Sequence, residues 1–126
     1  MRLVGTVLIL ITTLGLHGSG SSQEITRDQA REIVIVFLKS QGYHVTSPKF
    51  DLENAQDDAD FPDFYLFAAY QDTAARLVTL GSYAVNRKTA DLWERIGCTK
   101  IRSKAIEPLQ KQLRKESSAS TANPCF

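Results

Sequence analysis

The fold of this 126-residue chain is decided by residues 64–71, which read FYLFAAYQ. Side chains of a strand alternate between the two faces of a sheet, and here apolar residues fall on both faces. A strand of this kind is typical of the interior of a sheet. Residues 64–71 therefore predict a central strand, and other parts of the chain must cover both of its faces.

Further strands are predicted before and after this one. After Pro48, apolar and charged residues alternate, which indicates a half-buried, peripheral strand. On the other side of a turn, Gly81 marks a bulge within a longer strand. The predicted strands, in chain order, are residues 49–53, 64–71, 76–86 and 91–95.

A helix is predicted at each end of this series of strands. Thr26 and Gln29 have the spacing of a capping box, and the apolar residues that follow recur at helical spacing, which predicts a helix over 27–41. Residues 103–115 return to helical spacing. The proline in that segment suits only the first helical turn, so the regular helix begins near Glu107.

Taken together, these elements predict an α+β fold. We expect an antiparallel sheet of three to four strands packed against an N-terminal helix, with a C-terminal helix. Residues 23–116 form one domain in this interpretation, and residues 117–126 form a flexible tail because they are rich in Ser, Thr, Ala and Asn. The composition, 43% hydrophobic and 23% charged, suits one small globular domain.

The first 22 residues predict export from the cytoplasm. Met1 and Arg2 supply a positive start, residues 3–16 carry no charge, and small residues occupy 18–22. This is the layout of a secretory signal peptide. The rival interpretation is a retained anchor, but about 14 apolar residues fall short of the roughly 20 needed to span a bilayer. We expect cleavage, no stable membrane anchor afterwards, and a secreted or periplasmic location.

Cys98 and Cys125 are the two cysteines of the chain. In an oxidising compartment such a pair can form a disulfide, here tying the tail to the end of the sheet region. In the alternative, Cys98 packs as a small hydrophobic residue and Cys125 stays free in a frayed tail. The sequence leaves both alternatives open.

Residues 83–93 resemble the last hairpin of PepSY-like and cystatin-like modules of exported bacterial proteins. In those modules a strand ends in Asp or Asn, a Thr-Gly pair makes the turn, and a hydrophobic residue opens the next strand. Asn86, Thr89 and Leu92 fit this pattern, whereas Ala90 replaces the Gly, which would permit a positive φ that Ala resists. The chain is also similar to small NTF2-like immunity proteins. These resemblances imply a non-catalytic binding or inhibitor module.

The residues that common catalytic sites require are missing from the processed sequence. His44 is then its single histidine, so an HExxH zinc site cannot form, and neither a GxSxG motif nor a glycine-rich phosphate loop occurs. We predict no enzyme activity, no cofactor and no metal. The alternative is an envelope enzyme or metal-binding protein that uses the acidic loop from Asp57 to Asp63. Its spacing is not that of an EF-hand, and a solvated loop explains it better.

A surplus of large apolar side chains predicts a binding surface. If the first helix covers one face of the sheet, Tyr65 and Phe67, together with Trp93 or Tyr83, must find cover on the other, from the second helix or from a partner. Burial in the core is the alternative for each of them. The predicted binding residues are Tyr65, Phe67, Tyr83 and Trp93.

Charge is distributed unevenly along a chain whose net charge is +1. Residues 50–72 hold seven acids and no base, whereas residues 76–126 hold ten bases and four acids. These halves either attract each other within the fold or form a dipolar surface that steers a charged partner. The small net charge predicts no nucleic-acid partner. We expect an exported binding or inhibitor module whose unknown partner, a hydrolase or a toxin, lies in the envelope or outside the cell.

Overall fold

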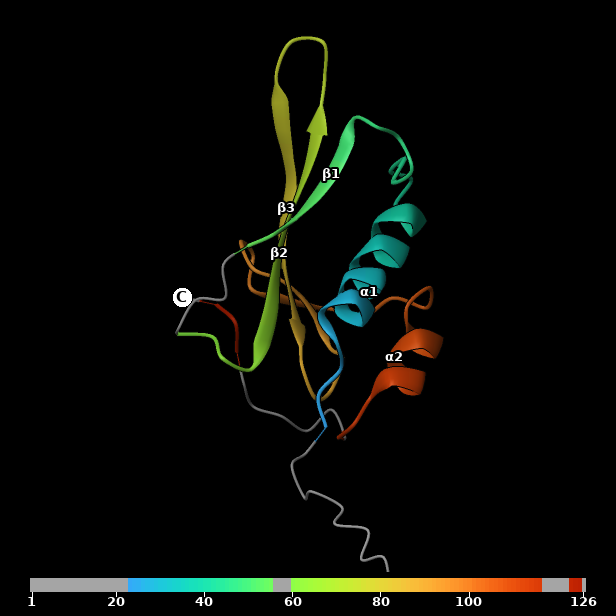
Figure 1. Cartoon of the computed structure of the whole chain (residues 1–126), viewed down its shortest axis with the longest axis vertical. Coiled ribbons are helices and arrows are strands. Elements are labelled where there is room, and N and C mark those ends of the chain that lie inside the picture. The colour runs from blue at the N-terminus through green and yellow to red at the C-terminus, as the bar shows by residue number, and fades with distance from the viewer. Residues whose placement is uncertain (1–22, 56–59, 117–122, 126) are drawn as a thin grey trace, which may run out of the picture.

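The computed structural model describes residues 23–55, 60–116 and 123–125 (Figure 1). The predicted signal peptide, residues 1–22, lies outside them. No helix among the described residues has the length and apolar character to cross a membrane. The elements, in chain order, are α1 (Arg27–Ser40), β1 (Phe50–Asn54), β2 (Phe64–Asp72), β3 (Leu77–Asn86), β4 (Leu92–Glu94), β5 (Thr99–Ile101) and α2 (Glu107–Leu113).

The strands form one antiparallel sheet in the order β1-β2-β3-β4-β5, so each strand pairs with its neighbours in sequence. This confirms the predicted α+β class and the interior position of β2. Strand β5 adds to the three to four strands that were expected. Its three residues are too few to carry a period-two pattern that could be recognised in the sequence.

Helix α1 begins where its capping box predicts. The Thr26 hydroxyl accepts a hydrogen bond from the Gln29 N–H at 3.1 Å, and the Gln29 side-chain oxygen accepts one from the Thr26 N–H at 2.9 Å. The helix ends just before Gly42, whose φ of 93° favours glycine. Helix α2 also begins as predicted, with its proline in the first turn.

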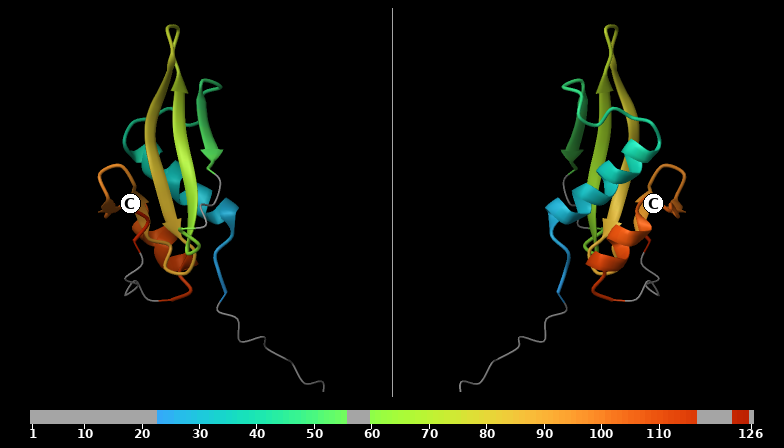
Figure 2. Two further views of the ribbon diagram at one scale, coloured as in Figure 1. Left: turned by 90° about the vertical axis from the view of Figure 1, so that its left-hand side faces the viewer. Right: turned by 90° about the vertical axis from the view of Figure 1, so that its right-hand side faces the viewer.

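Both helices lie on the same face of the sheet (Figure 2). On this face, α1 and α2 pack with apolar side chains of the strands into the larger of two cores. A smaller core on the opposite face holds Phe61, Phe64, Leu66 and Ala84, with Trp93 packed against it. The apolar residues on both faces of β2 therefore serve two different cores.

The predicted bulge lies beside Gly81. Ala69 of β2 pairs with Gly81, and Tyr70 pairs with Thr79, which leaves Leu80 as the extra residue of β3. A Cβ atom at position 81 would come within 2.7 Å of the ring of Tyr83. A side chain at this position would force the buried ring of Tyr83 to shift, so glycine is favoured where the ring lies directly against the backbone.

Candidate functional site

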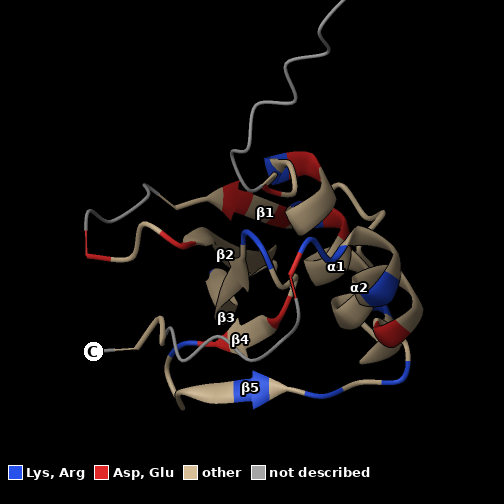
Figure 3. Ribbon diagram, turned by 90° about the horizontal axis from the view of Figure 1, so that it is seen from below, with Lys and Arg blue, Asp and Glu red and all other residues tan. Residues whose placement is uncertain are grey.

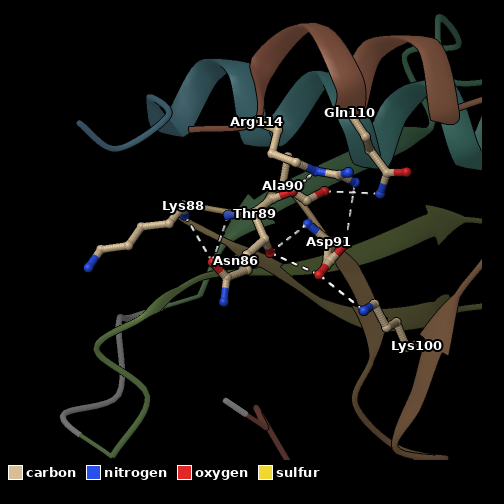
Figure 4. Close-up of polar contacts among 8 residues, drawn as sticks. All are labelled: Asn86, Lys88, Thr89, Ala90, Asp91, Lys100, Gln110 and Arg114. Carbon is tan, nitrogen blue, oxygen red and sulfur yellow. Dashed lines mark hydrogen bonds and ion pairs between the residues drawn. The ribbon is translucent and has the colours of Figure 1, made fainter. Parts of the chain in front are cut away.

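The turn between β3 and β4 is built around a buried asparagine (Figure 4). The Asn86 side-chain oxygen accepts hydrogen bonds from the backbone N–H groups of Lys88 at 2.9 Å and Thr89 at 3.0 Å. The Asn86 backbone also pairs with Asp91 and Ala90 across the turn. Asparagine favours such turns because its side chain can replace a backbone acceptor. This explains the Asn position of the hairpin motif.

Ala90 occupies the position where the hairpin motif has glycine. It is fully buried and has a φ of 61°, in the left-handed region that alanine resists. The Gln110 side-chain amide of α2 donates a hydrogen bond to the Ala90 carbonyl at 3.0 Å. Helix α2 thus helps to hold this turn in its strained conformation.

Asp91 connects three parts of the fold. Its side chain is 9% exposed, and the carboxylate accepts a hydrogen bond from the Thr89 hydroxyl at 2.9 Å. Lys100 of β5 lies 3.1 Å from one carboxylate oxygen, and Arg114, which caps α2, lies 3.9 Å from the other. The Arg114 side chain also donates to the Thr89 carbonyl at 3.2 Å. The turn, β5 and the end of α2 are therefore fixed to one another.

A pocket of about 230 Å³ opens beside this network, between β5 and α2. We call it the basic pocket. Its lining holds four cationic and two anionic side chains, an excess of two positive charges. Among the described residues that line it there is no histidine, cysteine or serine to act as a nucleophile. The lining consists of Asp91, Lys100, Ile101, Arg102, Glu107, Gln110, Lys111 and Arg114.

Charge is separated across the sheet (Figure 3). The exposed acids Asp51 and Glu53 lie on β1, at one edge, whereas Lys100 lies on β5, at the other, with Arg102 just after it. Four strand spacings separate these edges, about 19 Å. That distance exceeds the Debye length of about 8 Å at physiological ionic strength. Attraction between these two edges is therefore largely screened, and each edge presents its own charge to solvent.

The structure does not bring the four predicted binding residues onto one surface. Phe67 and Tyr83, 0% and 5% exposed, lie in the core beneath α1, and Tyr65 packs against the same core. Trp93 is half-buried on the opposite face. The expectation that Tyr65 and Phe67 occupy the face away from α1 is therefore wrong. The alternation of side chains along a strand predicts which residues share a face of the sheet. It does not predict which of the two faces packs against the helix.

Tyr65 anchors the segment that leads into α1. Its hydroxyl donates a hydrogen bond to the Ile25 carbonyl at 2.8 Å. The guanidinium groups of Arg27 and Arg87 lie 4.9 and 4.3 Å from the centre of its ring, within the range of cation–π interactions. These contacts give Tyr65 a structural role within the fold.

Only part of the acidic loop can be placed. Asp57 and Asp58 lie outside the described residues, while Asp60 and Asp63 are exposed. Within the described ranges, no three His, Cys, Asp or Glu side chains gather in a way that could hold a metal ion. The structure therefore adds no observation in favour of the alternative metal or enzyme site.

Cys98 and Cys125 form a disulfide in the structure, with Cα atoms 5.6 Å apart. It holds residues 123–125 against the turn between β4 and β5. Pro124 is fully buried there, and its carbonyl accepts a hydrogen bond from the Arg95 side chain at 3.2 Å. Residues 123–125 lie on the face of the sheet opposite the helices (Figure 2).

The fold and the basic pocket define a small α+β domain suited to attracting an anionic group. The chain is similar in structure to a chain of a type VI secretion system effector–immunity complex from Pseudomonas protegens. The TM-score is 0.62 at 25% sequence identity, and the match covers 71% of this chain and 75% of that chain. No protein-family model matches the sequence, and no curated protein does. The resemblance to PepSY-like and cystatin-like modules stays a prediction.

Proposed function

We propose that this protein is an exported, non-catalytic binding module of the immunity type, which binds a protein effector and inhibits it. The observation that carries the proposal is the structural similarity to a chain of an effector–immunity complex. The similarity extends over most of the domain rather than over a single hairpin. A protein partner is therefore the class of ligand that the comparison supports.

The chemistry of the site supports binding rather than catalysis. In the basic pocket, the buried carboxylate of Asp91 already engages the Thr89 hydroxyl, Lys100 and Arg114. A general base must be able to reach a substrate proton, and this carboxylate is held within the fold. The pocket thus offers fixed positive charge to a ligand, which is a property of a binding surface.

Export rests on the sequence of residues 1–22 and gains support from the disulfide. Disulfides persist in oxidising compartments such as the periplasm or the extracellular space and are rare in the cytosol. The Cys98–Cys125 bond fits such a compartment.

The test is to isolate the partner and measure inhibition. The full chain is expressed with a tag in the organism it comes from and is cross-linked to its neighbours in the cell envelope. The captured proteins are identified by mass spectrometry. The purified candidate is mixed with the protein, and complex formation is measured by size-exclusion chromatography. In a second assay, the toxicity of the candidate to cells is compared with and without co-expression of the protein. We expect a stable complex and relief of toxicity on co-expression. A protein that turns over a substrate, or that leaves the toxicity of every bound candidate unchanged, would contradict the proposal.

A matched variant separates this proposal from the acidic-loop alternative. Asp60→Asn combined with Asp63→Asn removes two exposed charges from that loop. Partner binding is expected to stay unchanged, because both residues lie outside the basic pocket. An enzyme or metal site in the acidic loop would lose its activity in this variant.

A further inference from the structure

We infer that the basic pocket is the docking site for an acidic segment of the protein partner, with the carboxylates of that segment entering between β5 and α2. This inference rests on the proposed function and names the chemistry of the surface that the partner presents. It goes beyond the aromatic residues singled out in the sequence, since none of them lines this pocket.

The first support is the balance of charge in the pocket. The pocket lining has four positive charges. Asp91, which pairs with Lys100 and Arg114, balances one of them, and the charge of Glu107 balances a second. The excess of two positive charges remains, and the side chains of Arg102 and Lys111 are exposed to solvent. Because the whole chain is nearly neutral, this edge differs in charge from the rest of the molecule. Such a patch attracts a negatively charged surface and orients it.

The second support is the size of the pocket. Pockets for small molecules and cofactors usually measure about 300 to 1,000 Å³. At about 230 Å³, the basic pocket is smaller than that range and suits one or two side chains. A carboxylate carried on a protein segment fits these limits better than a free nucleotide.

The third support is that two of the four cations, Lys100 and Arg114, are held in place before a ligand arrives. Lys100 and Arg114 are positioned by Asp91, and Arg114 is also held by the Thr89 carbonyl. Gln110, on the same wall, is fixed by its hydrogen bond to Ala90. Groups that are already ordered lose less conformational entropy on binding, so a ligand gains more from each contact.

The test uses a hexaglutamate peptide as the probe. The peptide is titrated into the isotope-labelled, processed protein at low ionic strength, and backbone amide shifts are followed by NMR. We expect the largest shifts at Ile101, Arg102, Gln110 and Lys111, and a loss of binding as salt is added. Arg102→Glu combined with Lys111→Glu should weaken binding by about tenfold or more.

A control variant has the same change in net charge. Lys39→Glu combined with Lys49→Glu reverses two exposed lysines that lie outside the basic pocket, and it should bind the peptide as the unaltered protein does at equal ionic strength. If both double variants lose binding equally, the attraction is non-specific and the inference is overturned. Circular dichroism checks whether the charge-reversing variants fold like the unaltered protein. If the pocket variant does not, Arg102→Gln combined with Lys111→Gln removes the two charges without reversing them and replaces it in the titration.

Three further outcomes are decisive. If inorganic phosphate at matched ionic strength shifts the pocket amides and hexaglutamate does not, the site takes phosphate and the inference is wrong. If the captured partner binds the Arg102→Glu/Lys111→Glu variant as tightly as the unaltered protein, the pocket is not its docking site, although the proposed function stands. If no partner is captured, the proposed function fails, and the peptide titration still decides whether the pocket binds carboxylates.

Discussion

Ala90 combines two opposing contributions to stability at a single residue. Its left-handed backbone conformation costs an alanine about 1 kcal/mol relative to glycine. Its methyl group is fully buried, and burial of such a group contributes about 0.8 kcal/mol. Relief of backbone strain and loss of burial should therefore nearly cancel on substitution by glycine.

We predict that Ala90→Gly changes the free energy of unfolding by less than about 0.5 kcal/mol. The matched control is Ala30→Gly in α1, which removes an equally buried methyl group from a helix and should cost about 1.5 to 2 kcal/mol. Urea denaturation of both variants measures the difference. Equal losses would mean that the left-handed conformation at residue 90 carries no strain.

Ionisation of the buried Tyr83 hydroxyl makes the free energy of unfolding depend on pH in the alkaline range. Burial raises the pKa of its hydroxyl above the usual 10.0, and the nearby Tyr43 and Glu94 raise it further. Above about pH 10 the unfolded chain loses this proton while the folded chain retains it. The stabilising contribution is therefore complete below pH 10 and is lost as pH rises through the folded-state pKa.

Replacing Tyr83 by Phe removes this ionisation and leaves the ring in place. The free energy of unfolding of the variant should fall less steeply above about pH 10 than that of the unaltered protein. Urea denaturation at a series of pH values measures the two slopes. Identical slopes for the two proteins would contradict the assigned effect of burial.

At the scale of elements, Phe67 and Trp93 lie on opposite faces of the sheet and differ in how deeply they are buried. Phe67 is fully buried between β2 and α1, and its replacement by Ala should cost about 3 to 5 kcal/mol. Trp93 is half-buried on the face without helices, so Trp93→Ala should cost clearly less. Chemical denaturation combined with a partner-binding assay measures both effects. A stable Phe67→Ala variant that no longer binds the partner would place Phe67 in an interface instead.

Local pattern predicted most of the elements well. The capping box of Thr26 and Gln29 located the start of α1, and the proline restriction located the start of α2 near Glu107. Both signals act over a few residues, so the sequence carries them directly. The side of the sheet on which α1 packs depends on contacts between distant segments, and no local pattern encodes that choice.

At the scale of the whole molecule, the disulfide joins residues 27 positions apart and holds residues 123–125 against the turn between β4 and β5. Closing a loop of this length restricts the unfolded chain, and the chain-entropy relation gives a stabilisation of about 3.5 kcal/mol. Cys98→Ser combined with Cys125→Ser should lower the free energy of unfolding by roughly that amount.

Two measurements check the disulfide. Chemical denaturation compares the double variant with the unaltered protein. Intact mass with and without reductant should differ by the two hydrogens that the bond removes. An unchanged mass would show that the thiols are free, and the stability difference would then be expected to vanish.

The sequence by itself determined the α+β class, the positions of most helices and strands, the bulge at Gly81 and the hairpin of Asn86 and Thr89. Each depends on a short-range period or turn preference, which can be read from neighbouring residues. Only the tertiary structure decided which aromatic residues lie under α1 and which cations line the basic pocket. Lys100, Arg102, Lys111 and Arg114 belong to segments separated by turns, so their meeting in one pocket depends on how β5 and α2 pack and not on any spacing along the chain.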